Sequence, residues 1–71
     1  MTELELYVVY DHPKDFPDNF VVRKWILDKP TEEFKLYNSL IYARQVQRKA
    51  GRVCLGRSPR FDDPVIVETW L

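Results

Sequence analysis

Residues 31–51, TEEFKLYNSLIYARQVQRKAG, are the stretch around which we expect the rest of the chain to fold. Thr31 is a suitable N-cap, because its hydroxyl can accept a hydrogen bond from a free amide of a first helical turn. Gly51 suits the position that follows a helix, where a positive φ costs glycine little. Arg48 and Lys49 precede it, as the helix dipole favours. The pattern therefore predicts one helix over residues 31–51.

Four shorter segments alternate in the manner of β-strands, with successive side chains pointing to opposite faces. They are residues 4–10, 19–27, 52–56 and 65–71. Two proline-bearing segments without periodicity separate the strands of each pair. The order is therefore ββαββ, which predicts an α+β fold with the helix packed on one face of a four-stranded mixed sheet.

The first and last strands are the most apolar, so we place them side by side and parallel at the centre of the sheet. This arrangement predicts the strand order 2-1-4-3, with 1-2-3-4 as the alternative. A chain of 71 residues forms one domain, residues 1–71, with room for one helix on one sheet. It has no room for a deep substrate pocket, unless subunits combine to build one.

The two faces of the predicted sheet differ in composition, and one helix can cover only one of them. One face is almost entirely aliphatic, and we expect the helix there: Leu4, Leu6, Val8, Phe20, Val22, Ile26, Val53, Leu55, Val65, Val67 and Leu71. The other face is rich in aromatic residues, and its interaction candidates are Tyr7, Val9, Arg23, Trp25, Ile66 and Trp70. Exposed apolar patches of this kind mark interaction sites.

This aromatic face predicts a non-enzymatic protein-interaction module. Self-association into a homodimer and binding of another protein are both open, and so is cover by the chain's own loops. Single-stranded nucleic acid is a further alternative, because bases stack on aromatic rings. However, Glu5 and Glu68 on the same face would repel phosphate.

Charge is unevenly distributed, although the net charge is zero. Residues 34–61 contain seven basic residues and no acidic one: Lys35, Arg44, Arg48, Lys49, Arg52, Arg57 and Arg60. The five arginines of this segment are candidates for an anion or nucleic-acid patch, with scattered solvated charge as the alternative. True phosphate contacts would make binding salt-dependent.

No spacing typical of catalysis or metal binding is visible. His12 is the only histidine, and the aspartates around it, at positions 11, 15 and 18, lack zinc or EF-hand spacing. Two glycines are too few for a phosphate-binding loop, and Cys54 has no second cysteine with which to form a disulfide. We expect no enzyme, no cofactor and no metal.

The opening segment MTELELYVVY lacks the basic start and the long apolar run of a signal peptide. No stretch approaches the ~20 apolar residues of a membrane span. We therefore expect a soluble, cytoplasmic protein without membrane contact.

Two segments, YDHPKDFPDNFVVRKW at 10–25 and SPRFDDPVIVETWL at 58–71, resemble those of small uncharacterised proteins from bacteriophages and prophages. The resemblance covers 30 of the 71 residues. It implies a phage or prophage origin and implies nothing about activity or ligand.

Overall fold

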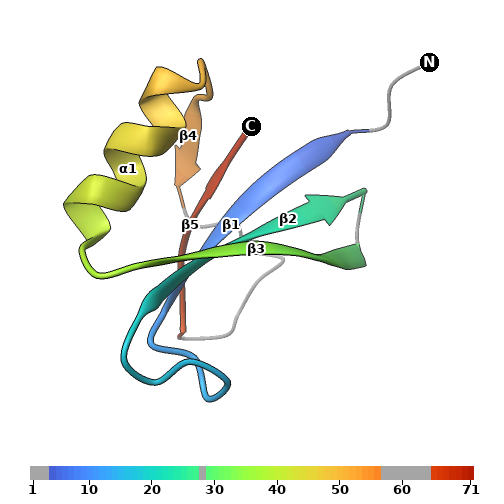
Figure 1. Cartoon of the computed structure of the whole chain (residues 1–71). Helices are drawn as coiled ribbons and strands as arrows, with labels where there is room; N and C mark the ends of the chain where they lie inside the picture. The colour runs from blue at the N-terminus through green and yellow to red at the C-terminus, as the bar shows by residue number, and fades with distance from the viewer. Residues whose placement is uncertain (1–3, 28, 57–64) are drawn as a thin grey trace.

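Five antiparallel strands form one open sheet, and a helix lies on one of its faces (Figure 1). The computed structural model describes residues 4–27, 29–56 and 65–71. The elements follow in the order β1 (Glu5–Asp11), β2 (Phe20–Ile26), β3 (Lys29–Tyr37), α1 (Leu40–Lys49), β4 (Cys54–Gly56) and β5 (Ile66–Trp70). The α+β class is thus confirmed.

The first half of the predicted helix is a strand, β3, which pairs antiparallel with β2. Over residues 34–37, FKLY, the side chains alternate between the two faces, and this period of two prevails over the helical spacing of the longer window. Thr31 does not cap a helix. Its hydroxyl donates instead to the carbonyl oxygen of Lys24 across the strand pair, at 2.7 Å. The prediction of a helix is therefore wrong before residue 40.

The end of α1 matches the prediction, whereas its start lies further along the chain. Ser39 is the N-cap, and its hydroxyl accepts from the Tyr42 N–H at 3.4 Å. Gly51 has a φ of 81°, and its amide and the next one donate to carbonyl oxygens of the last turn at 3.0 and 3.1 Å. This is the hydrogen-bond pattern of a glycine-terminated helix. None of the helices in the described residues is long and apolar enough to cross a membrane.

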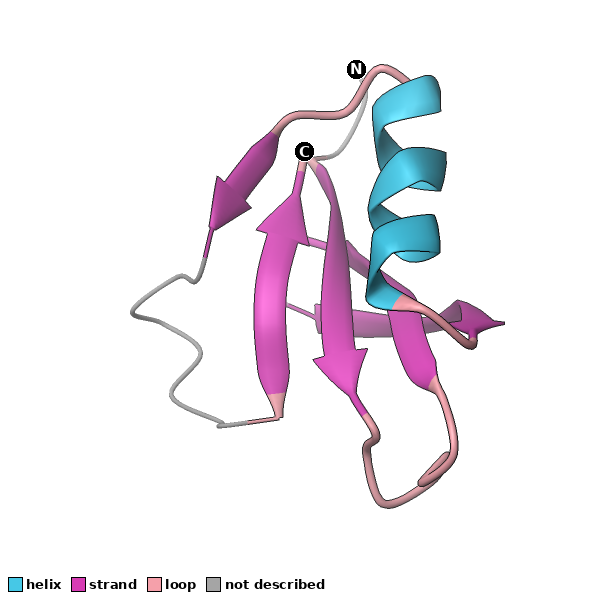
Figure 2. Cartoon of the chain, turned by 90° about the vertical axis from the view of Figure 1, so that its left-hand side faces the viewer, coloured by secondary structure: helices cyan, strands magenta, loops and turns pink. Residues whose placement is uncertain are grey.

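The strand order is β3-β2-β1-β5-β4, with α1 on one side of the sheet (Figure 2). The predicted four-stranded sheet, with the order 2-1-4-3 or 1-2-3-4, is wrong because residues 29–37 add a fifth strand at one edge. The first and last strands are neighbours, as expected, but they are antiparallel. The additional strand reverses the chain once more before α1, and this reversal changes the direction of every later strand.

We call the side of the sheet that α1 covers the near face, and the opposite side the far face. The near-face core contains Val9, Val22, Tyr37, Ala43 and Trp70, none more than 8% exposed. The expectation that the aliphatic face lies under the helix holds for Phe20, Val22 and Val67 and is wrong for Leu6 and Val8 of β1. In the β1–β2 ladder Val9 lies opposite Val22, and directly opposed residues point to the same face. This register joins aliphatic residues of β2 to the aromatic side of β1.

A β-bulge changes the alternation of β5. The register shifts so that Glu68 lies opposite Val9 and Ile66 lies opposite Tyr10. Val67 consequently packs against the near-face core, and Ile66 lies on the far face. Several other aliphatic residues expected under the helix are exposed: Leu4, Val53, Leu55 and Leu71.

Candidate functional site

The six residues predicted to share one interaction face are divided between the two faces. Three lie on the near face, in or against the core: Tyr7, Val9 and Trp70. Three lie on the far face: Arg23, Trp25 and Ile66. The expectation of one common uncovered surface is therefore wrong for the first three. The far-face residues stay candidates for a docking site.

The near face holds its tryptophan in a charged network. Trp70 donates from Nε1 to the Glu68 carboxylate at 2.7 Å. Arg44 of α1 donates to the same carboxylate from Nε and Nη2, at 2.8 to 3.2 Å. The hydrogen bond with Glu68 raises the pKa of the Arg44 guanidinium above its ordinary value. Glu68 is only 5% exposed, so this network satisfies a carboxylate at the margin of the core.

Two further arginines of the predicted basic patch lie over near-face rings. The Arg48 guanidinium is 5.9 Å from the centroid of the Trp70 ring, and that of Arg52 is 3.6 Å from the Tyr7 ring. Both contacts are cation–π interactions. Arg57 and Arg60 lie outside the described residues. Within the described chain, the arginines of the basic segment thus make intramolecular contacts with the near face.

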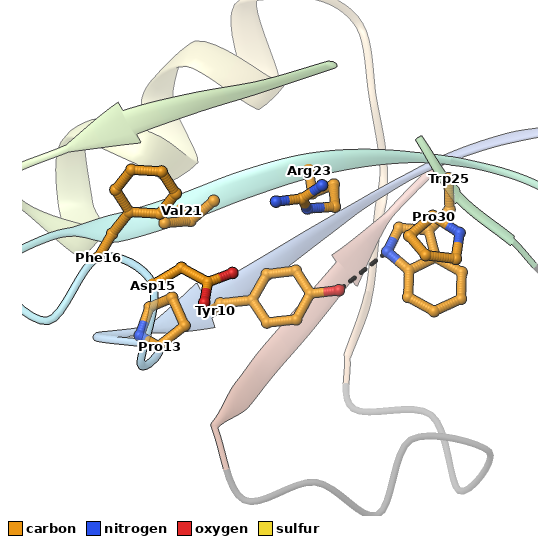
Figure 3. A pocket seen from close by; sticks show the side chains of 8 residues that line it. All are labelled: Tyr10, Pro13, Asp15, Phe16, Val21, Arg23, Trp25 and Pro30. Carbon is orange, nitrogen blue, oxygen red and sulfur yellow. Dashed lines mark hydrogen bonds between the residues drawn. The ribbon is translucent and has the colours of Figure 1, made fainter. Parts of the chain in front are cut away.

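A shallow hollow of about 260 Å³ lies on the far face (Figure 3). Aromatic rings, prolines and two charged residues line it: Tyr10, Pro13, Asp15, Phe16, Val21, Arg23, Trp25 and Pro30. Three of them are alternate residues of β2, which share one face of the strand. We call this feature the far-face hollow.

Polar contacts hold the lining side chains in place. Trp25 donates from Nε1 to the hydroxyl of Tyr10 at 2.9 Å, which joins β2 to β1 across the far face (Figure 3). Arg23 donates from Nη1 to the carbonyl oxygen of Thr31 at 2.8 Å. Its guanidinium also lies 4.9 Å from the centroid of the Phe34 ring. The floor of the hollow is therefore ordered by the sheet itself.

The loop between β1 and β2 forms one end of the far-face hollow. The Phe16 ring packs against the Phe34 ring of β3, with 5.1 Å between centroids. The base of the loop is closed by a hydrogen bond from the His12 amide to the Asn19 carbonyl at 3.1 Å. Asp15 is exposed, and it forms no hydrogen bond or ion pair with another described residue. The loop therefore places beside the rings a carboxylate that no other described residue pairs with.

A second hollow, of about 340 Å³, lies on the near face next to β3. Its lining is more polar: Tyr7, Val22, Glu32, Glu33, Phe34, Lys35, Tyr37 and Gln47. Lys24 forms ion pairs with Glu5 at 3.1 Å and with Glu33 at 3.4 Å. The hydrogen bond with Glu5 is the main cause that raises the pKa of Lys24. Of the charged residues that line this hollow, Glu33 is already paired with Lys24, and we take the more aromatic far-face hollow as the candidate docking site.

The sequence-based prediction of the interaction face omits six lining residues of the far-face hollow: Tyr10, Pro13, Asp15, Phe16, Val21 and Pro30. One signal for them is present in the loop DHPKDFPD, where a phenylalanine stands among prolines and charged residues. A large apolar ring in a polar loop indicates that the loop packs against the body of the domain. The contribution of Tyr10 depends on the pairing of β1 with β2, which the sequence does not show.

In residues 4–27, 29–56 and 65–71, no three side chains of His, Cys, Asp or Glu come together as metal ligands. The side chains of Asp11 and His12 touch each other. The His12 ring also packs edge-on against Phe20, with 4.8 Å between centroids. The Cys54 thiol is free and exposed.

Comparison of the chain with protein-family models, with curated proteins and with solved structures finds no match. The resemblance of residues 10–25 and 58–71 to phage and prophage proteins therefore stays a prediction.

Proposed function

We propose that this chain is a small non-enzymatic protein-interaction module, and that the far-face hollow is its docking site. One observation supports this most strongly. Trp25 and Tyr10 are hydrogen-bonded to each other on the face that α1 does not cover, and both line a hollow. Tryptophan, tyrosine and arginine dominate the binding energy of protein interfaces. All three residue types line this hollow.

The size of the hollow favours a protein partner over a free small molecule. Its volume of about 260 Å³ lies below the roughly 300–1,000 Å³ of typical small-molecule sites. A shallow site of this size accommodates one or two side chains of a larger ligand. The surrounding surface would then contact the rest of that ligand.

Photo-crosslinking tests the proposal. A benzophenone amino acid replaces Phe16 at the hollow or, as the control, Ile41, which is 68% exposed on α1. In extracts of the source cells, we expect protein adducts from position 16 only, and their loss when Trp25→Ala is added. Adducts from neither position, or equally from both, would contradict a docking site on the far face.

A second copy of this chain is one partner of the proposed class. Analytical ultracentrifugation over a concentration series tests this homodimer. Self-association through the far face predicts a mass that rises with concentration in the native chain and stays monomeric in Trp25→Ala. A monomer at all concentrations removes the homodimer and leaves binding of another protein.

Nucleic-acid binding through the basic segment 34–61 is the alternative proposal, and the contacts of its arginines favour it less. Arg44 pairs with Glu68, while Arg48 and Arg52 lie over aromatic rings. A gel-shift assay at low salt with micromolar protein separates the two proposals. Binding that weakens steeply with added salt would favour nucleic acid, and its absence would end this alternative.

A further inference from the structure

We infer that the far-face hollow binds an extended, proline-containing peptide segment with a basic residue at one end. The inference rests on the proposed function, because it names the partner of the same site. It is carried by three observations: the length of the ring-lined surface, the composition of its walls, and the charge of the adjoining loop.

The ring-lined surface is elongated. Phe16 and Trp25 lie at opposite ends of the far-face hollow, with Tyr10 between them (Figure 3). Val21 and Trp25 are four positions apart in β2, which corresponds to about 13 Å at ~3.3 Å per residue. A polyproline II helix rises ~3.1 Å per residue, so about four residues of such a segment span this distance. The shape therefore fits an extended segment better than a compact group.

The walls of the hollow are chemically suited to proline. Three aromatic rings and two prolines present flat, apolar surfaces, and proline-rich segments are recognised by aromatic-lined grooves. Such segments are already extended before binding, so they lose little conformational entropy when they dock. A shallow hollow that contacts few residues benefits most from a ligand of this kind.

Arg23 supplies hydrogen-bond donors that this ligand requires. The carbonyl groups of a polyproline II segment have no internal partners. Of the five N–H donors of a guanidinium, Arg23 uses one for Thr31 among the described contacts. The remaining donors lie at the hollow, where they can donate to peptide carbonyl oxygens. Proline lacks a backbone N–H, so the hollow need not supply a hydrogen-bond acceptor for it.

The charge of the loop at the Phe16 end selects a basic residue. Residues 11–18, DHPKDFPD, contain three aspartates and one lysine. Asp15 lines the hollow and has no ion pair with another described residue. A lysine or arginine that flanks the proline segment would pair with this carboxylate. The same charge sets the direction of the peptide, with its basic end toward the loop.

The experiment is an NMR titration of the ¹⁵N-labelled full chain with synthetic capped peptides. The probes are a proline hexamer with arginine at its start, the same hexamer with arginine at its end, one with glutamate in place of arginine, and one uncharged. A glycine–serine peptide carrying arginine is the control for charge alone. We expect saturable shifts of the Trp25 indole N–H and of the Tyr10, Phe16 and Arg23 amides. One arginine position should bind best, glutamate worst, and the glycine–serine peptide should cause no shift.

Three variants connect binding to the named residues. Trp25→Ala should weaken binding by about thirtyfold or more, as truncation of a hot-spot residue does. Asp15→Asn should lower the affinity for the arginine peptide by about two- to fivefold, as loss of an exposed ion pair does. Its affinity for the uncharged peptide should stay the same. Ile41→Ala, on the exposed side of α1, should change nothing. Asp15 is exposed, so its substitution tests the inference even if Trp25→Ala fails to fold.

Other results overturn the inference. Shifts confined to α1, no shifts at millimolar peptide, or equal binding of the glycine–serine peptide each exclude a proline ligand. Concentration-dependent shifts of the same amides without peptide would identify a second copy of the chain as the occupant. If crosslinking at position 16 succeeds while every peptide fails, the proposed function stands and the proline ligand is wrong. If crosslinking fails as well, both are wrong.

Discussion

Each face of the sheet contains one tryptophan whose indole N–H donates a hydrogen bond, yet the two rings have different surroundings. Trp70 is 2% exposed, and the carboxylate that accepts its bond is held in turn by Arg44. Trp25 is half-buried, and its acceptor is the hydroxyl of Tyr10. The near face thus uses aromatic rings as core, whereas the far face keeps them at the surface. Substitutions that compare the two faces separate stability from binding.

The largest expected difference is between Trp70→Ala and Trp25→Ala. Loss of the Trp70 ring leaves a cavity in the near-face core and should cost about 3–5 kcal/mol of unfolding free energy. A chain of this length has a total stability of only about 4–11 kcal/mol, so much of it is lost. Trp25→Ala should cost about 1–2 kcal/mol, because the ring is only partly buried. Urea denaturation followed by circular dichroism measures both, and equal losses would contradict the distinction between the faces.

The next largest difference in unfolding free energy is expected between substitutions of two arginines, one on each face. Each arginine joins two elements of the fold. Arg44→Leu leaves the Glu68 carboxylate, whose side chain is 7% exposed, without its cation and should cost about 1–3 kcal/mol. Arg23→Leu removes a bond to a neutral carbonyl oxygen and should cost about 0.5–1.5 kcal/mol. The same urea measurements apply. A larger loss for Arg23→Leu would show that the far face bears more of the stability than we infer.

A comparison of the native chain with Tyr37→Phe at alkaline pH probes the near-face core. Burial raises the pKa of Tyr37 above its ordinary value of 10.0. The folded chain therefore keeps this proton where the unfolded chain loses it. Stability from this residue is complete below the unfolded pKa and is lost as pH rises through the folded one. Tyr37→Phe should consequently lose less stability than the native chain above about pH 10.

Denaturation midpoints at several alkaline pH values test this expectation. Lys24, whose raised pKa acts in the same direction, is present in both chains, so its effect cancels from the comparison. An identical decline in the two chains would show that Tyr37 is not the group responsible.

The smallest expected change in unfolding free energy comes from a turn residue that belongs to neither face. Its effect can be compared with those of the substitutions on the two faces. Leu27 has a φ of 58° and is 56% exposed, so its left-handed conformation carries strain that glycine avoids. Leu27→Gly should raise the unfolding free energy by about 1 kcal/mol. The control is the opposite kind of substitution, Gly51→Ala, at another residue with a positive φ, 81°. It should lower the unfolding free energy by about the same amount. Destabilisation by Leu27→Gly would mean that its side chain contributes contacts that outweigh the strain.

The end of the helix was predictable from sequence because the signal is local. Gly51 with Arg48 and Lys49 before it identifies the terminus, and the structure places the helix end there. The start was not predictable by the same means. Thr31 and Ser39 are both suitable N-caps by residue type, and only the pairing of β3 with β2 decides between them.

The division of residues between the faces depends on contacts distant in sequence. Alternation within β1 correctly separates Tyr7 and Val9 from Val8. The register of the β1–β2 ladder decides which side of β2 lies on the same face as Tyr7 and Val9. The bulge in β5 changes which of its residues lie on that face. Trp25 and Arg23, which we propose for docking, were therefore identified by residue type, whereas their separation from Trp70 required the structure.

The outer edge of the sheet has a consequence for how the chain behaves at high concentration. β3 lies at the end of the strand order, so its outward backbone groups face no further strand of the described chain. Such edges invite pairing with strands of other molecules. Pro30, Glu32, Glu33 and Lys35 place a missing donor and three charges along this strand, which disfavours that pairing. These four residues, at the start and along the length of β3, therefore disfavour fibrous aggregation through this edge of the sheet.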